Sequence, residues 1–161
     1  MGGVYNKFHD DGVNVDEKRR LDVFAVDFNT SVKSTKTSIN GEWVYAMINI
    51  PKKSAPQFGN KQHGFFVDVV QTVMKKNMLG WGNATLNIAL RIERVDYNIG
   101  NFSATGNKIY DDVWAGTFGI SFRPSAQTVI RANYRRAWDK DLLGNTPAKT
   151  GGLYVGFSTY F

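Results

Sequence analysis

Apolar residues recur at every second position along most of this sequence, and this period constrains the fold more than any other feature. In the segment 85–97, Leu86 and each second residue up to Ile92 are apolar, whereas the residues between them include Arg91 and Glu93. Successive side chains of a β-strand point to opposite faces, so the pattern predicts a strand with one apolar and one polar face.

The same two-residue alternation predicts strands along the whole chain. No segment has a sustained helical period, no internal repeat is visible and no linker divides the sequence. We therefore expect one all-β domain over residues 1–161, an antiparallel up-and-down sheet of about eight strands. The expected strands are 3–8, 20–32, 39–50, 64–74, 85–97, 113–123, 128–138 and 152–161.

The alternation does not say which face meets water, but the links between the strands do. Counted from the C-terminus, long links (139–151, 98–112, 51–63 and 9–19) alternate with shorter ones (124–127, 75–84 and 33–38). All the long links then fall at one end of the sheet. This asymmetry is typical of outer-membrane β-barrels, which have short periplasmic turns and longer external loops.

Aromatic residues lie where such a barrel would meet the two membrane interfaces. Tyr97, Trp114 and Trp138 fall at the long-link ends of their strands, and Phe122 and Phe161 fall at the short-link ends. Amphipathic rings concentrate at both interfaces of a bilayer. The sequence thus predicts a transmembrane barrel, with a soluble β-barrel or sandwich that binds a small ligand as the alternative.

Composition excludes several other classes. No apolar run approaches the roughly 20 residues of a spanning helix. The 161 residues include no cysteine, which excludes disulfides and thiolate metal sites. The opening MGGVYNKFHDDG lacks the features of a secretory signal peptide. Taken alone this indicates a cytoplasmic protein, but removal of a signal, or a longer parent chain, would give the same start.

The C-terminal LYVGFSTYF resembles the assembly signal of Gram-negative outer-membrane proteins, a final Phe preceded by alternate apolar residues. The matching residues are Phe161, Phe157, Val155 and Leu153, and Thr159 departs from the aromatic often found there. Further upstream, HGFFVDVVQTV, LNIALRIERVDYN and VWAGTFGISFRPSAQTVIRANYRR resemble the closing strands of the phosphate-selective porin (O and P) family.

This resemblance covers roughly residues 20–161 and carries several expectations. Porins of this family form 16-stranded barrels, so the resemblance implies that the eight strands expected here are the C-terminal half of such a barrel. The implied location is the cell outer membrane, and the implied partners are membrane lipid, lipopolysaccharide and the outer-membrane assembly machinery. A homotrimer is compatible with it. The implied activity is passive diffusion of small hydrophilic solutes with an anion preference, phosphate being one candidate.

The polar faces of the strands carry the residues we expect to line a pore. Arginine offers several donors in a fixed fork and stays charged, so it can replace the hydration shell of an anion. Arg131 and Arg135 are four apart in one strand, about 13 Å at the usual rise, a spacing that suggests an anion ladder. The alternative is that the arginines pair with Glu93, Asp68 and their neighbours. The candidate pore-lining residues are Asp68, Asn87, Arg91, Glu93, Arg123, Arg131, Asn133 and Arg135, with Asp27 on the same side.

Other chemistry has little support in the sequence. The two histidines, His9 and His63, have no motif around them, and we predict neither an enzyme nor a bound cofactor. Acid pairs at 10–11 and 111–112 could hold Ca²⁺, although solvated loop charge is the better explanation of both pairs. Cations and aromatics lie on opposite strand faces, which argues against nucleic acid. A standalone eight-stranded barrel acting as anchor or adhesin remains the competing membrane hypothesis.

Overall fold

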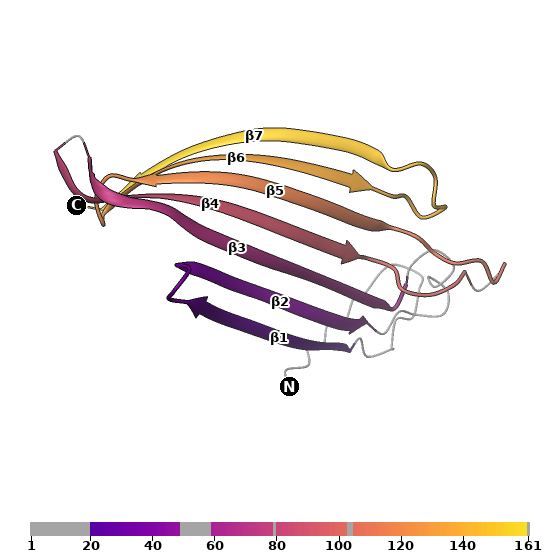
Figure 1. Cartoon of the computed structure of the whole chain (residues 1–161). Helices are drawn as coiled ribbons and strands as arrows, with labels where there is room; N and C mark the ends of the chain where they lie inside the picture. The colour runs from indigo at the N-terminus through magenta and orange to yellow at the C-terminus, as the bar shows by residue number, and fades with distance from the viewer. Residues whose placement is uncertain (1–19, 49–58, 79, 103–104, 161) are drawn as a thin grey trace, which may run out of the picture.

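The computed structural model describes residues 20–48, 59–78, 80–102 and 105–160. They form one antiparallel sheet of seven strands in chain order, an up-and-down meander (Figure 1), which confirms the predicted all-β class. The candidate strand 3–8 lies outside the described residues. The strands are β1 (Leu21–Val32), β2 (Thr37–Ile48), β3 (Lys61–Met78), β4 (Trp81–Asp96), β5 (Asp112–Arg123), β6 (Thr128–Asp139) and β7 (Ala148–Thr159).

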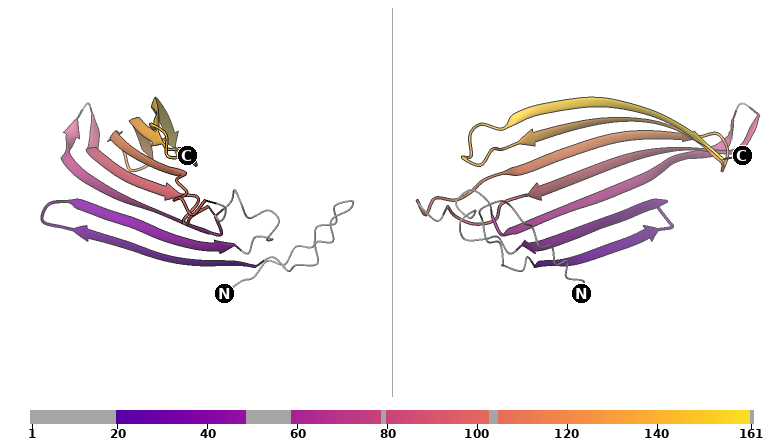
Figure 2. Two further views of the ribbon diagram at one scale, coloured as in Figure 1. Left: turned by 90° about the vertical axis from the view of Figure 1, so that its right-hand side faces the viewer. Right: turned by 180° about the vertical axis from the view of Figure 1, so that it is seen from behind.

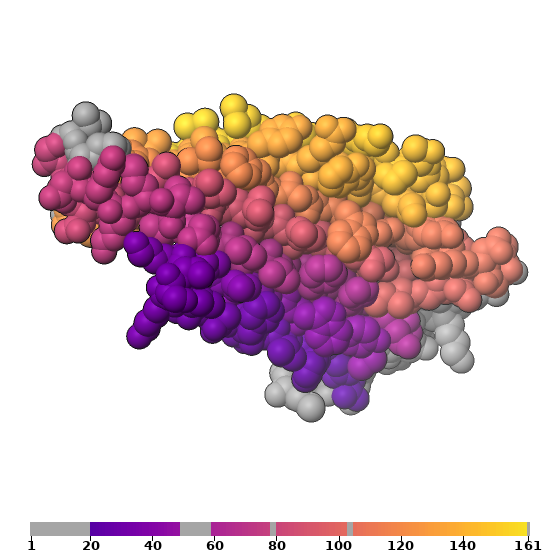
Figure 3. All heavy atoms as spheres, in the orientation of Figure 1, coloured from indigo at the N-terminus to yellow at the C-terminus, as the bar shows by residue number. Residues whose placement is uncertain are grey.

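The sheet is a curved single layer with two open edges. Figure 2 shows the layer bent into an arc, and in Figure 3 the strands lie side by side in chain order from indigo to yellow. Within the described residues each strand contacts only its neighbours in sequence, and β1 does not touch β7. Closure into a barrel therefore stays a prediction.

Most of the predicted segments lie close to the observed strands, but the predicted link 75–84 is wrong. There β3 continues to Met78 and β4 begins at Trp81, so this hairpin is longer than the others (Figure 1). The register shifts between Thr72 and Met74 and again between Lys76 and Met78. These β-bulges interrupt the two-residue period, so the alternation of the sequence did not reveal this part of β3 and β4. The last strand likewise begins earlier than expected, at Ala148.

The links at one end of the sheet are short, and those at the other end are long. The stretches 33–36, 79–80 and 124–127 connect strands at one end, which we call the short-turn end. The stretches 49–60, 97–111 and 140–147 connect strands at the other, the long-loop end. The long loop 97–111 has its own backbone bonds, from Ile109 N to Gly100 O at 2.9 Å and from Phe102 N to Asn107 O at 2.8 Å.

The strand register carries each face across the whole sheet. Asp68, Arg91, Thr117 and Arg135 are paired in one row across β3 to β6, and we call their side the charged face. The other side, the apolar face, bears large exposed side chains on β1, β2 and β4 to β7, and Phe65, Val67 and Val69 of β3 are half-buried on it. Examples of the exposed side chains are Phe24, Val26, Phe28, Trp43, Leu90, Ile92, Trp114, Phe118, Ile120, Ile130, Tyr134, Trp138, Leu153, Val155 and Phe157. The buried hydrophobic residues are few and mostly small.

A row of rings crosses the apolar face near the long-loop end. The register aligns Trp138, Trp114, Arg94, Phe65 and Trp43 on β6 to β2, in that order. The Phe65 and Trp114 rings meet edge to face with centroids 5.8 Å apart, and Arg94 lies over Trp114 at 5.3 Å. We call this the aromatic row.

The predicted interface aromatics lie at the ends of the sheet to which the sequence assigned them. Trp114 and Trp138 are direct partners in the aromatic row, and Tyr97 directly follows β4 at the long-loop end. At the short-turn end Phe122 contacts Trp81, with ring centroids 6.2 Å apart. Phe161 lies outside the described residues. That these rings meet lipid headgroups stays a prediction.

One glycine on the apolar face is required by close packing. Phe28 lies directly opposite Gly41, and a Cβ at Gly41 would approach the Phe28 ring and the Phe66 carbonyl oxygen to 2.7 Å. Gly156 on β7 has no atom within 4 Å of such a Cβ. We expect Gly41→Ala to lower the free energy of unfolding by about 1–2 kcal/mol through overpacking. Denaturant unfolding of the refolded chain checks this.

The matched control for that experiment is Gly156→Ala, which also replaces a strand glycine but meets open space. It should be neutral or slightly stabilising, because alanine restricts the unfolded chain. Equal destabilisation by the two substitutions would contradict the packing argument.

Candidate functional site

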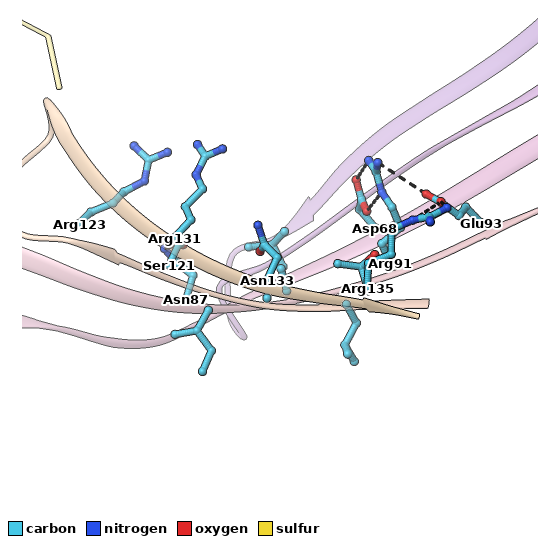
Figure 4. Close-up of a pocket in the computed structure, with 15 residues that line it drawn as sticks. Asp68, Asn87, Arg91, Glu93, Ser121, Arg123, Arg131, Asn133 and Arg135 are labelled. Carbon is cyan, nitrogen blue, oxygen red and sulfur yellow. Dashed lines mark hydrogen bonds and ion pairs between the residues drawn. The ribbon is translucent and has the colours of Figure 1, made fainter. Parts of the chain in front are cut away.

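The charged face is hollowed over β3 to β6, and this hollow is the candidate site (Figure 4). Its volume is about 560 Å³. Four arginines and two carboxylates line it, so two positive charges are in excess. The charged and amide residues in its lining are Asp68, Asn87, Arg91, Glu93, Arg123, Arg131, Asn133 and Arg135.

Two of the four arginines are held in an ion-pair network toward the long-loop end. Arg91 donates to Asp68 through Nε and Nη2, both at 2.6 Å, in the paired geometry that favours guanidinium and carboxylate. Arg135 donates from Nε to Glu93 Oε1 at 3.0 Å, and Arg91 Nη1 lies 4.0 Å from Glu93 Oε2. The charges of this network cancel.

Small residues on β5 make this network possible. Arg135 is on β6 and Glu93 on β4, so the salt bridge must cross β5. The β5 residues that pair with them in register are Thr117 and Ala115, and Ala115 is buried beneath the bridge. The guanidinium carbon of Arg91 lies over the ring of Phe66 on β3, 4.4 Å from the ring centroid. Large side chains on β5 would separate the two charges.

Toward the short-turn end the charged face is polar but carries no carboxylate in its central row. Thr72, Asn87, Ser121 and Arg131 are paired across β3 to β6. Thr72 donates to Asn87 Oδ1 at 2.7 Å, and Asn87 donates to Ser121 Oγ at 3.3 Å. These bonds align neutral groups beside Arg131.

The two remaining arginines form no ion pair with any residue that the structure describes. Arg123 and Arg131 stand side by side on the same face, apart from the cluster of Asp68, Arg91 and Glu93 (Figure 4). Both are exposed, and no carboxylate among the described residues lies within ion-pairing distance of either. The positive charge that is open to a ligand is therefore concentrated in this pair.

All eight predicted pore-lining residues line the hollow, but the structure separates the arginines into two kinds. Arg131 and Arg135 share a strand and a face, as the ladder hypothesis required. Arg135 is nevertheless neutralised by Glu93, as the alternative hypothesis required. Arg131 and Arg123 are instead the two arginines of the hollow that have no carboxylate partner among the described residues. The ladder hypothesis did not include Arg123. Asp27 lies on the charged face near the β1 edge, opposite Glu42 and away from the hollow.

Several contributing residues were not among the predicted set. Asn40 donates to Asp68 at 3.2 Å, and Thr72, Ser121 and Phe66 support the arginines or their neighbours. Their positions in the two-residue period place all four on the charged face. Alternation could thus have nominated them, but only the register shows which residues they meet.

The acid pairs considered for Ca²⁺ give no cluster in the part of the chain that the structure describes. Asp111 accepts a hydrogen bond from Asn98, and Asp112 lies 3.5 Å from Arg94. No group of three or more potential metal ligands occurs among residues 20–48, 59–78, 80–102 and 105–160. The pair at 10–11 and His9 lie outside these residues. Within the same ranges no helix is long and apolar enough to cross a membrane.

Comparisons with protein-family models, curated proteins and solved structures find no match to this chain. The resemblance to the phosphate-selective porin family consequently rests on the residues quoted above. The fold and the hollow are therefore interpreted from their own geometry.

The bidentate pair of Asp68 and Arg91 provides a direct test of the network. The Arg91 side chain is 40% exposed and that of Asp68 19%, so solvent screens their attraction. In a cycle of Asp68→Asn, Arg91→Gln and the double variant, we expect a coupling energy of about 1 kcal/mol. Denaturant unfolding measures it. A coupling indistinguishable from zero would show that the pair does not hold the face together.

Proposed function

We propose that this chain forms part of the wall of an outer-membrane porin that passes small hydrophilic solutes with an anion preference. The supporting observation is a one-layer sheet with an uncovered apolar face and a hollowed, cation-rich face. The short-turn end would face the periplasm and the long loops the outside. Further strands of the same polypeptide would close the wall at β1 and β7, and a homotrimer of such barrels is compatible with this proposal.

The state of the apolar face supports a membrane location. Leu153, Val155 and Phe157 on β7 are 71%, 73% and 68% exposed. A soluble domain buries such a face against a second layer, and the described residues supply none. From Trp114 to Phe122 the face extends about 26 Å along β5 at the usual rise. This is near the apolar band of about 25 Å in membrane barrels.

The unpaired arginines support the anion preference. Fixed positive charge raises the local concentration of anions, and guanidinium donors replace part of their hydration. Arg91 and Arg135 contribute less, because Asp68 and Glu93 neutralise them. The selectivity should thus depend on Arg123 and Arg131. Phosphate is one of the small anions that such a pair can bind.

A second candidate is a closed small barrel that serves as an anchor or adhesin. The network of Asp68, Arg91, Glu93 and Arg135 favours it, because eight-stranded barrels are filled by their own side chains. Such a barrel would insert into membranes without conducting ions. Conductance therefore separates the two candidates.

We expect the intact protein to conduct in planar bilayers and its reversal potential in a KCl gradient to indicate a preference for chloride. Arg123→Gln together with Arg131→Gln should move the reversal potential toward zero, because the two uncompensated charges are lost. A cation-selective pore, or no conductance, would refute the porin proposal.

The matched control for the conductance experiment is the pair Asp68→Asn and Arg91→Gln. It also removes two charged groups from the hollow, but it leaves the net charge unchanged. The reversal potential of this variant should stay close to that of the wild type. An equal shift in both variants would assign the selectivity to pore shape and not to the two free arginines.

In such a porin the C-terminal residues that end at Phe161 would serve as the signal for assembly into the outer membrane. The free edge of β7 offers unpaired backbone groups to which another strand can add. We expect Phe161→Ala to lower the amount of protein in the outer membrane of cells, measured by membrane fractionation. Tyr160→Ala changes an aromatic on the other face and is the control. Equal levels of wild type and the Phe161→Ala variant would count against an assembly signal.

A further inference from the structure

Two arginines lie on the apolar face within the strands, and their surroundings differ. Arg94 lies in the aromatic row and is balanced by Asp96 at 3.6 Å and Asp112 at 3.5 Å. Arg136 lies one row closer to the centre of the sheet and is exposed. No carboxylate of the described residues lies within ion-pairing distance of Arg136. A charge on a lipid-facing surface is unfavourable unless it is paired or reaches the interface.

The local structure directs Arg136 toward the long-loop end. Its guanidinium carbon lies 5.8 Å from the centre of the Trp138 ring, which belongs to the aromatic row. Glycines flank Arg136 on both neighbouring strands, Gly116 on β5 and Gly151 on β7. A Cβ at Gly116 would have no neighbour closer than 4.0 Å, so the surface beside the arginine is open.

Further donors lie in the rows next to Arg136 on the same face. Lys149 on β7 is the register partner of Trp138 and is exposed. The Tyr134 hydroxyl lies over Gly151, where an added Cβ would approach it to 3.0 Å. We call Tyr134, Arg136, Trp138 and Lys149 the Arg136 patch. It combines two cations, a hydroxyl and an indole at the level where an aromatic belt meets headgroups.

Most of the nearby acids have other described partners, and Asp139, which follows Trp138 on β6, pairs in register with Val113 on the charged face. Asp96 and Asp112 pair with Arg94, and Asp111 accepts a bond from Asn98. Asp141, in the loop after β6, accepts bonds from Asn145, whose side-chain amide is the main cause of a lowered pKa for that carboxyl. The carboxylates at this end that have described partners are thus directed away from Arg136 and Lys149, which leaves the patch electrostatically complementary to an anion.

We propose that the Arg136 patch binds the phosphate group of an anionic membrane lipid at the long-loop end, an inference that rests on the membrane location proposed above. The side chain of Arg136 is long enough to extend its charge from the apolar band to the interface, as arginines near membrane boundaries do. There its guanidinium and the Lys149 ammonium donate to phosphate oxygens. The lipid chains lie along Tyr134 and Leu153, which are register partners on the apolar face.

Native mass spectrometry of the detergent-refolded chain tests this inference with two lipids of equal chain length, phosphatidylglycerol and phosphatidylcholine. The wild type should bind the anionic lipid more tightly. Arg136→Gln with Lys149→Gln should lower that preference by about fivefold for each cation removed. Inorganic phosphate at the same concentration should not displace the lipid, because it lacks the chains.

The control is Arg123→Gln with Arg131→Gln, which removes the same charge from the opposite face and should retain the lipid preference. An unchanged preference in the Arg136→Gln, Lys149→Gln variant, or an equal loss in the control, would overturn the proposal. Resistance of vesicle-bound wild type to carbonate extraction is measured in parallel. Extractable wild-type protein would refute the membrane location as well, whereas inserted protein with no lipid preference would refute the lipid site alone.

Discussion

The structure depends on keeping apolar and charged side chains on opposite faces of a single layer. The described residues form almost no interior, so the faces and not a core define this part of the chain. A slip of one residue in any strand pair would move every side chain of that strand to the wrong face. The unbroken register of five of the six pairs maintains the separation from β1 to β7. The bulges in β3 are confined to the part near the short-turn end.

Within the charged face, the same register decides which arginines remain available. The row that contains Asp68 and Arg91 brings acids and bases together across β3 and β4, and small β5 residues allow β6 to join them. The row that contains Ser121 and Arg131 has only neutral partners. Arg131 and Arg135, which are four positions apart on one strand, thus acquire different chemistry. One half of the charged face is neutralised by ion pairs, and the other half carries two cations without a carboxylate partner among the described residues.

The candidate site shows which of its properties follow from the alternation of the sequence and which do not. Alternation correctly placed Asp68, Arg91, Glu93, Arg131 and Arg135 on one face, because side-chain direction in a strand is local. It could not distinguish Arg131 from Arg135. That distinction requires the strands to be aligned, since Glu93 is distant in sequence and is reached only across β5. On the apolar face, the contrast between Arg94 and Arg136 has partly the same origin, because Asp112 belongs to the next strand, whereas Asp96 is two residues from Arg94 on the same strand.

The sequence by itself determined the strand class, the faces and the sorting of short and long links, because these follow from the two-residue period and from where it stops. It missed the extension of β3 and β4 to a turn at 79–80, since the bulges remove the period there. Only the tertiary structure decided the register, the curvature and the order of the seven strands, in which β1 and β7 have a single neighbour each among the described residues. It also decided which charges are paired, because pairing depends on distances between strands that no local pattern encodes.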